Sequence, residues 1–265
     1  MYFTKEMLTK IAEEERELVH KFSDQYAEMK CSVDMGAEYD VIWAEGLAEP
    51  YYIAYINDIE KMRERKIFKK EPKNKVFSAK HFFKDGRPVY SVFMDDKGEP
   101  VCEKFFSEQG NVRLGMIYYG RRFSEISTET FDDEGKPVSY RCTAIKKDIG
   151  RPAEMTCKFF VYGYEYKHIV SAWCIDSFDI SKEVTMYDDP MYNDWENRSI
   201  EYKMSTPPMN PNFLAEYKFI YGENGSPSEY SRTEYRYCNV GTGQWKASKK
   251  VFEKFAKNGI SWFNK

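Results

Sequence analysis

Histidine and cysteine are the residue types in this chain best suited to nucleophilic, acid–base or metal chemistry. His20, His81 and His168 lie far apart, and no His-x-x-x-His or Cys-x-x-Cys spacing offers the paired ligands of a zinc site. A Cys–His catalytic pair could still be assembled by the fold, because such partners need not be close in sequence. The spacing therefore selects no catalytic residue and no metal ligand. For each histidine it favours a solvated or structural role.

Motifs for covalent or cofactor chemistry are also missing. The sequence has no G-x-S-x-G elbow, no phosphate loop ending in Gly-Lys-Ser/Thr, and no dinucleotide fingerprint. The stretch 241–245, Gly-Thr-Gly-Gln-Trp, lacks the third glycine of such a loop, so we read it as a turn. We expect no catalytic residue and no cofactor, although an enzyme with an unrecognised site stays open.

Six cysteines raise the question of disulfides. The chain is too long for a small disulfide scaffold, and several cysteines fall within strand-like runs. A thiol in such a position usually acts as a small buried apolar group, which is the role we expect here. The cysteines are Cys31, Cys102, Cys142, Cys157, Cys174 and Cys238.

The most conspicuous polar cluster is an acidic loop with interleaved aromatic residues. Its carboxylates could hold Ca²⁺, but their spacing does not match an EF-hand, and we expect no metal. The rings could anchor a long loop onto a sheet, or they could contact a basic protein partner such as a toxin domain. Both alternatives stay open, and the second makes this loop the candidate partner-contact site. Its residues are Tyr187, Asp188, Asp189, Tyr192, Asp194, Trp195 and Glu196.

A basic cluster precedes the strand-rich part of the chain. Such a cluster could touch phosphate backbones, but it has few interleaved aromatic residues, so a solvated helix end and linker is favoured. The formal net charge of −3 provides no strong field for nucleic acid or an anionic membrane, and we expect neither as a partner. The cluster comprises Arg63, Arg65, Lys66, Lys69, Lys70, Lys73 and Lys75.

The composition favours β-structure, and the absence of targeting signals favours a location in the cytoplasm. Aromatic residues make up 17% of the 265 residues, with 21 Tyr and 19 Phe, and aromatic rings pack well on a pleated surface. The sequence shows no secretory h-region and no apolar run long enough to span a bilayer. We therefore expect a cytoplasmic location. The sequence does not indicate an oligomeric state.

A recurring turn pattern organises the middle of the chain. Glycine supplies positive φ at little cost, and an acidic or amide residue before it favours the same tight turn. Successive glycines at 86, 98 and 110 are 12 residues apart, which fits one strand plus one turn of an antiparallel meander. The main copies are Asp85-Gly86-Arg87-Pro88-Val89, Asp96-Lys97-Gly98-Glu99-Pro100-Val101 and Asp133-Glu134-Gly135-Lys136-Pro137-Val138.

Between these turns the hydrophobic period is two, which predicts about ten strands. The predicted class is α+β: a large antiparallel β-meander, forming an open curved sheet or partial barrel, with N-terminal helices and a C-terminal helix. We expect strands near 76–83, 88–94, 100–106, 112–119, 122–131, 137–146, 154–162, 164–175, 213–222 and 229–238.

The flanking segments read as helices. Residues 4–30 have apolar spacing typical of an amphipathic helix, and a second helix is expected from Pro50. A closing helix is expected over 246–257. We predict a single domain over 1–265, divided into a helical N-terminal segment at 1–75, a meander at 76–240 and a C-terminal helix at 245–258.

Alternation along the strands predicts a sheet with unequal faces. At 100–106, Glu103 and Phe105 alternate with Lys104 and Phe106. One face is therefore expected to be buried, and the other to carry a mixture of aromatic and charged residues in solvent, as antiparallel sheets commonly do. At 122–131 the same alternation places Phe123 and Phe131 on one face with Glu125 and Glu129.

The (Asp/Glu)-x-Gly-x-Pro-Val turns, flanked by runs such as His81-Phe82-Phe83-Lys84 and Glu103-Lys104-Phe105-Phe106, resemble two groups of β-hairpin repeats. One is the tyrosine–aspartate repeat of Rhs-type wall and toxin proteins. The other is the MORN-like repeat of bacterial antitoxin and immunity proteins. The resemblance covers residues 76–175, with an echo at 213–238, and lacks a strict period and a fixed Tyr-Asp pair.

This resemblance implies a non-catalytic protein-binding module, in concrete terms a bacterial immunity or antitoxin-like protein that blocks a toxin. A wall- or carbohydrate-binding repeat module is the main alternative.

Overall fold

The structure is a computed structural model that separates into two compact units. Unit 1 comprises residues 1–18 and 137–253, and unit 2 comprises residues 19–136 and 254–265. Each unit is described separately below. The described residues are 5–34, 36–45, 67–68, 70–73, 78–146, 154–165, 168–180, 214–221, 227–239 and 244–254.

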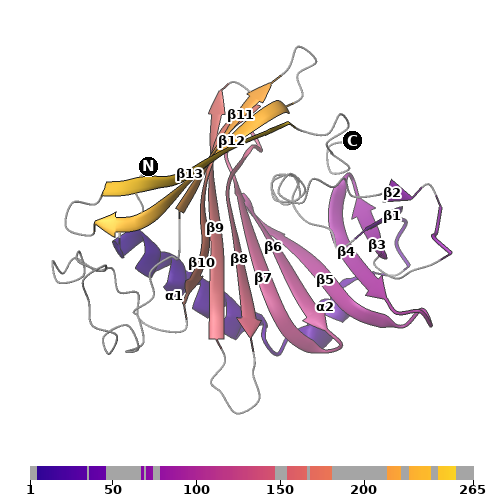
Figure 1. Cartoon of the computed structure of the whole chain (residues 1–265). Coiled ribbons are helices and arrows are strands. Elements are labelled where there is room, and N and C mark those ends of the chain that lie inside the picture. The colour runs from indigo at the N-terminus through magenta and orange to yellow at the C-terminus, as the bar shows by residue number, and fades with distance from the viewer. Residues whose placement is uncertain are drawn as a thin grey trace. The chain divides into compact units, whose positions relative to one another are not determined.

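Unit 2 contains an antiparallel sheet in the order β7-β6-β5-β4-β3-β1-β2 (Figure 1). From β3 to β7 each strand pairs with the next one along the chain, which confirms the predicted meander in this part of the sequence. The strands are β1 (Asp40–Glu45), β2 (Ile67–Phe68), β3 (Ser78–Lys84), β4 (Arg87–Met94), β5 (Pro100–Gln109), β6 (Val112–Tyr119) and β7 (Arg122–Phe131).

Unit 1 also contains a sheet in which consecutive strands are neighbours, in the order β13-β12-β11-β10-β9-β8. From β8 to β12, each strand pairs antiparallel with the next one along the chain. The strands are β8 (Pro137–Lys146), β9 (Glu154–Glu165), β10 (His168–Asp179), β11 (Leu214–Tyr221), β12 (Pro227–Asn239) and β13 (Gln244–Lys254).

The recurring turns are confirmed as strand reversals, and two of them share a hydrogen-bonded design. The Asp95 carboxylate accepts hydrogen bonds from the backbone N–H of Lys97 and of Glu99, both at 2.9 Å. The Asp132 carboxylate does the same for the residues at 134 and 136, at 3.0 and 2.8 Å. In both turns the carboxylate that accepts these bonds therefore belongs to the residue before the acid that begins the sequence pattern: Asp95 precedes Asp96, and Asp132 precedes Asp133.

Two helices complete the described fold: α1 (Lys5–Phe22) and α2 (Tyr26–Ser32). Within unit 1, α1 packs by apolar contacts, because Leu8 and Ile11 join a buried cluster with Phe159 and Ile175. Within unit 2, α2 buries no residue completely and instead makes polar bonds to the sheet. Neither helix has an apolar stretch long enough to cross a membrane.

Two predictions about helices are corrected. Residues 244–254 form strand β13 rather than part of the helix expected at 245–258, and the residues after 254 lie outside the described part of the chain. Because β13 lies next to β12, its backbone finds hydrogen-bonding partners there, and these override a weak local preference for helix. The segment 1–75 also contains β1 and β2 as well as helices. The helix expected from Pro50 falls outside the described residues.

A register irregularity corrects the predicted faces of β7. Tyr118 pairs with Phe123, whereas the neighbouring Ile117 pairs with Glu125, so Ser124 is an extra residue. Because side chains alternate with a period of two, one extra residue moves Phe123 to the opposite face from Glu125. The Phe123 ring lies 5.4 Å from the ring of Tyr118, centroid to centroid.

Candidate functional site: a buried polar face of unit 2

One face of the unit 2 sheet carries polar side chains that are buried. The strand register places them on the same face of β3 to β7, where the sequence predicted a mixed surface open to solvent. That prediction was right about composition and wrong about solvent exposure. A buried face of this kind is costly, because each polar group gives up water and needs a partner in the protein. The buried polar residues are His81, Ser91, Lys104, Ser127 and Glu129.

Lys104 is the most unusual member of this polar face. Its side chain is 0% exposed, and within the described part of the chain its Nζ has no hydrogen-bond partner. The amine lies 5.3 Å from the centroid of the Phe106 ring, a favourable but weak contact for a cation. Lysine is rarely buried completely unless it is paired. The burial of Lys104 therefore has no evident benefit for the stability of the fold.

Gly115 makes room for the lysine. A Cβ atom added at Gly115 would lie 2.7 Å from Cε of Lys104, 3.5 Å from its Nζ and 2.6 Å from Oγ of Ser127. The lysine amine and the serine hydroxyl therefore converge over the glycine backbone. Ser127 Oγ also donates a long hydrogen bond of 3.3 Å to the Gly115 carbonyl.

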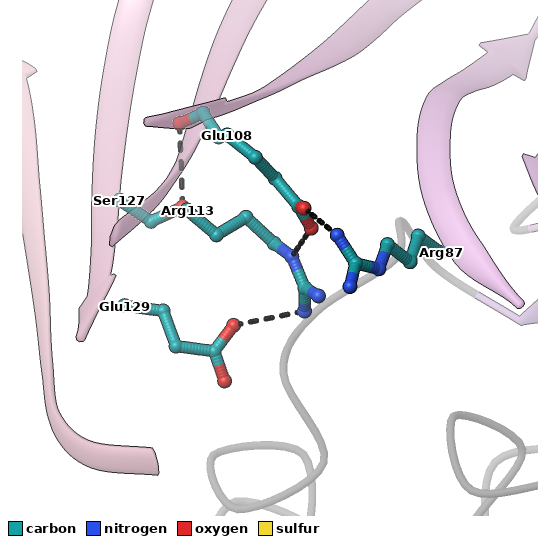
Figure 2. Close-up of polar contacts among 6 residues, drawn as sticks. Arg87, Glu108, Arg113, Ser127 and Glu129 are labelled. Carbon is teal, nitrogen blue, oxygen red and sulfur yellow. Dashed lines mark hydrogen bonds and ion pairs between the residues drawn. The ribbon is translucent and has the colours of Figure 1, made fainter. Parts of the chain in front are cut away.

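Beside Lys104 runs a chain of alternating charges across four strands, shown in Figure 2. Arg87 Nη1 lies 2.5 Å from Glu108 Oε2, and Glu108 Oε1 lies 3.0 Å from Arg113 Nε. Arg113 Nη1 then donates to Glu129 Oε2 at 3.2 Å. The chain begins at the exposed Arg87 and ends at the buried Glu129, so it connects the surface to the interior of the face.

The nearby cations only partly offset the cost of burying the charged Glu129 carboxylate. Burial raises the pKa of its carboxyl to about 7, although the nearby charges of Arg113 and Lys104 pull it downwards. The carboxyl therefore changes its charge near neutral pH. When it is protonated, the positive charge on this face increases.

His81 and Ser91 form a second polar pair on the same face. Nδ1 of His81 lies 2.9 Å from Oγ of Ser91, and both side chains are completely buried. A serine hydroxyl beside Nδ1 suits a structural or positioning role of His81.

A cavity of about 530 Å³ opens at one end of this face. Its wall includes the β3–β4 turn and the side chains of Arg87 and Glu108, which belong to the charge chain. Phe106 also lines the cavity, and the same ring contacts the Lys104 amine. The remaining lining residues are Lys84, Asp85, Pro88 and Val89.

On the opposite face of the sheet, a buried carboxylate has several hydrogen-bond donors. Glu103 is 3% exposed, and its carboxylate accepts hydrogen bonds from Tyr26 at 2.5 Å, from Lys30 at 2.5 Å and from Tyr90. Burial alone would raise the pKa of Glu103, but these bonds hold it below its ordinary value. Burial and the Glu103 carboxylate raise the pKa of Tyr26 to about 12. This cluster fastens α2 to the sheet and leaves no oxygen of Glu103 unsatisfied.

Three of the described cysteines behave as small core groups. Burial raises the pKa of the Cys102 thiol to about 11, and it also raises that of Cys157. A thiol with a raised pKa is a poor nucleophile, because the thiolate is the reactive form. Cys102, Cys157 and Cys174 are buried within strands, as expected, whereas Cys142 is half-buried and Cys31 is exposed on α2.

Most of the remaining sequence-based candidates lie outside the described residues. The partner-contact loop from Tyr187 to Glu196 lies outside the described residues, as does most of the basic cluster at 63–75. His20 is exposed on α1, and His168 begins β10, where it pairs in register with Glu165. The predicted protein partner and the carbohydrate-binding alternative therefore stay predictions.

The polar face itself was visible in the sequence but was interpreted differently. The alternation grouped Lys104 with Phe106 in one strand and Glu129 with Glu125 in another, without relating the two strands to each other. Alternation does not distinguish a solvated face from a buried one. Gly115 within a strand was a further signal, because an isolated glycine there often marks a close approach.

Comparison with known proteins adds little. No family model and no curated protein matches the sequence. A solved structure of a protein of unknown function from Bacteroides fragilis is 11% identical, covers 65% of this chain and 88% of that chain, and has a TM-score of 0.22. A porin-like protein from Bacteroides uniformis is 7% identical over 82% of this chain and 95% of that chain, with a TM-score of 0.14. Such low scores support no argument about fold or function.

Proposed function

We propose that the protein is a non-catalytic binding protein and that its ligand is held on the buried polar face of unit 2. The supporting observation is Lys104, which is completely buried without a hydrogen-bond partner among the described residues. An uncompensated buried ammonium destabilises a fold, and an apolar residue of similar volume is often better tolerated. Proteins commonly accept such local instability at positions that bind something.

Replacing lysines on the two faces of the sheet tests this proposal. Lys104→Met removes the unpartnered amine and keeps a flexible apolar chain beside Phe106. We expect the free energy of unfolding to rise by about 1 kcal/mol or more. The matched control is Lys30→Met, which removes a lysine that bonds Glu103 and should lower the free energy of unfolding.

Urea denaturation followed by circular dichroism measures both variants. Opposite signs for the two substitutions support a binding role for Lys104. If Lys104→Met is destabilised as Lys30→Met is, then the amine serves folding and the proposal fails.

An immunity- or antitoxin-like role is a second proposal, supported by the sequence alone. Its basis is the acidic, aromatic loop that includes Asp188, Asp189 and Asp194, together with the hairpin-repeat resemblance. Affinity capture from the native host should recover a specific toxin domain. Charge reversal at these three residues should weaken that complex, and indifference to the reversal would eliminate the loop as the contact.

A further inference from the structure

The cavity at the end of the polar face has a tight turn between β3 and β4 in its wall. Asp85 and Gly86 form this two-residue turn with φ of 52° and 73°, as in a type I′ hairpin. Lys84 and Arg87 are register partners on either side of it, so the turn brings two cations and one carboxylate to the cavity. An aspartate tolerates positive φ better than most residues and also supplies charge at this position.

Two of the four charged side chains that line the cavity already pair with each other. Glu108 accepts from Arg87 at 2.5 Å and from Arg113 at 3.0 Å, one bond at each carboxylate oxygen. Lys84 and Asp85 are exposed, and neither forms an ion pair with another described residue. With two cations and two carboxylates, the lining has no net charge. A ligand with one charge meets repulsion as well as attraction there, whereas a ligand with both charges can satisfy both groups.

The remaining lining residues are apolar and indicate what the rest of the ligand resembles. They are Phe106, Pro88 and Val89. Because Phe106 and Val89 are partly exposed, an apolar group placed against them would remove further apolar surface from water. The cavity volume of about 530 Å³ is within the range that accepts a small organic molecule.

We infer that this cavity binds a zwitterionic α-amino acid with an apolar side chain. The ligand ammonium faces Asp85, and its side chain lies against Phe106. Its carboxylate faces Lys84 and Arg87, whose guanidinium has donors besides the Nη1 that bonds Glu108. This inference rests on the proposed binding function and specifies its ligand class, but it uses only residues that line the cavity. Because the charged groups are exposed to water, we expect a dissociation constant on the order of 1 mM.

L-Phenylalanine and three analogues test the inference on the full-length protein. 3-Phenylpropanoate keeps the carboxylate and the ring, phenethylamine keeps the ammonium and the ring, and L-alanine keeps both charges without the ring. NMR titration of ¹⁵N-labelled protein at matched ionic strength measures each affinity, and the amide signals that shift show where the ligand binds. We expect phenylalanine to shift the amides of the β3–β4 turn and of Phe106. Each analogue should bind at least about threefold more weakly.

Two substitutions in the turn remove one charge each. Asp85→Asn keeps the positive φ, which asparagine tolerates, and should abolish the preference for phenylalanine over 3-phenylpropanoate. Lys84→Met should reduce the preference for phenylalanine over phenethylamine, and Arg87 should retain part of it. The matched controls Asp96→Asn and Lys97→Met make the same changes in the β4–β5 turn, outside the cavity lining. Both should bind phenylalanine within about 1.5-fold of the wild type.

Any of four results would overturn the inference: no binding of phenylalanine, equal affinity for a singly charged analogue, an unchanged preference in Asp85→Asn, or amide shifts confined to another part of the chain. The urea comparison of Lys104→Met with Lys30→Met involves neither the ligand nor the cavity lining, so it tests the proposed function separately. If Lys104→Met gains stability while phenylalanine fails to bind, the binding role stands with another ligand class. If phenylalanine binds while Lys104→Met loses stability, the cavity is a binding site and the role of Lys104 is structural.

Discussion

Glu103 and Lys104 are consecutive residues of β5 that point to opposite faces of the same sheet. Both are buried, at 3% and 0% exposure. Glu103 accepts hydrogen bonds from three donors, whereas Lys104 Nζ has none among the described residues. Burial by itself therefore does not separate a structural charge from a functional one. The difference lies in whether the fold supplies the partners.

The same contrast applies to the two faces as a whole. The α2 side is built from contacting rings, with Phe105 5.1 Å from Tyr90 and 5.8 Å from Tyr118, centroid to centroid. The buried Glu103 carboxylate on this side is satisfied, and the Thr128 hydroxyl is the buried polar group there without a hydrogen-bond partner among the described residues. The other side carries several buried polar groups, and the side chains of Lys104 and Ser127 occupy the position above Gly115. We interpret the first face as the one that holds unit 2 together and the second as the one that binds.

The largest expected effect is at the satisfied carboxylate. Glu103→Leu removes the acceptor shared by Tyr26, Lys30 and Tyr90, and leaves the Tyr90 hydroxyl buried without it. We expect a loss of about 4 kcal/mol in the free energy of unfolding, measured by urea denaturation. A loss below about 1 kcal/mol would contradict the structural role assigned to this face.

A pH titration of stability separates the two faces next. The pKa of Glu129 is about 7 in the folded protein, above its ordinary value of 4.5, so the folded state binds the additional proton between these values. Stability from this group is therefore present at low pH and is lost as the pH rises from about 4.5 to 7. The expected size is on the order of 3 kcal/mol. The pKa of Glu103 is lowered, so its contribution has the opposite sign and is lost only as the pH falls below the ordinary range.

Glu129→Gln isolates the first of these contributions. The difference in unfolding free energy between wild type and variant should shrink or reverse as the pH rises through this window. Glu15 of unit 1 also has a raised pKa, but it titrates in both proteins and cancels in the difference. A difference that is independent of pH would show that Glu129 is not buried as described.

Adding a methyl group at Gly115 should have a smaller effect. Gly115→Ala places a methyl group 2.6 Å from Ser127 Oγ and 2.7 Å from Lys104 Cε. We expect a loss of about 2 kcal/mol, because overpacking forces neighbours to shift. The double variant Gly115→Ala, Ser127→Ala should recover part of this loss relative to Ser127→Ala alone. A neutral Gly115→Ala would mean that the two side chains do not converge there.

The smallest expected loss of stability is at the turns, which belong to neither face of the sheet. Asp95→Ala or Asp132→Ala removes two turn hydrogen bonds and should cost about 1 kcal/mol each, measured by thermal unfolding. The adjacent Asp96→Ala and Asp133→Ala are controls and should change stability by less than about 0.5 kcal/mol. Equal effects at all four positions would reject the assigned capping roles.

Much of the meander was predictable, because its signals are local. Turns containing Gly86, Gly98 and Gly135 require positive φ, which few other residues adopt, and the three glycines have φ of 73°, 86° and 78°. Strands β3 to β12 begin and end within a few residues of their expected positions, where these are described. The extra residue Ser124 and the strand at 244–254 were missed, since a bulge and an edge pairing depend on the neighbouring strand.

The amino-acid sequence by itself determined where the chain reverses and which residues of most strands share a face, because turn chemistry and a period of two act over a few residues. Only the tertiary structure decided that the face of Lys104 is buried, that Glu103 finds three donors and that Lys104 finds none among the described residues. Burial and hydrogen-bond partners come from segments far apart in sequence. The physical reason is that a charge acquires its cost or its partner only when the strands around it assemble.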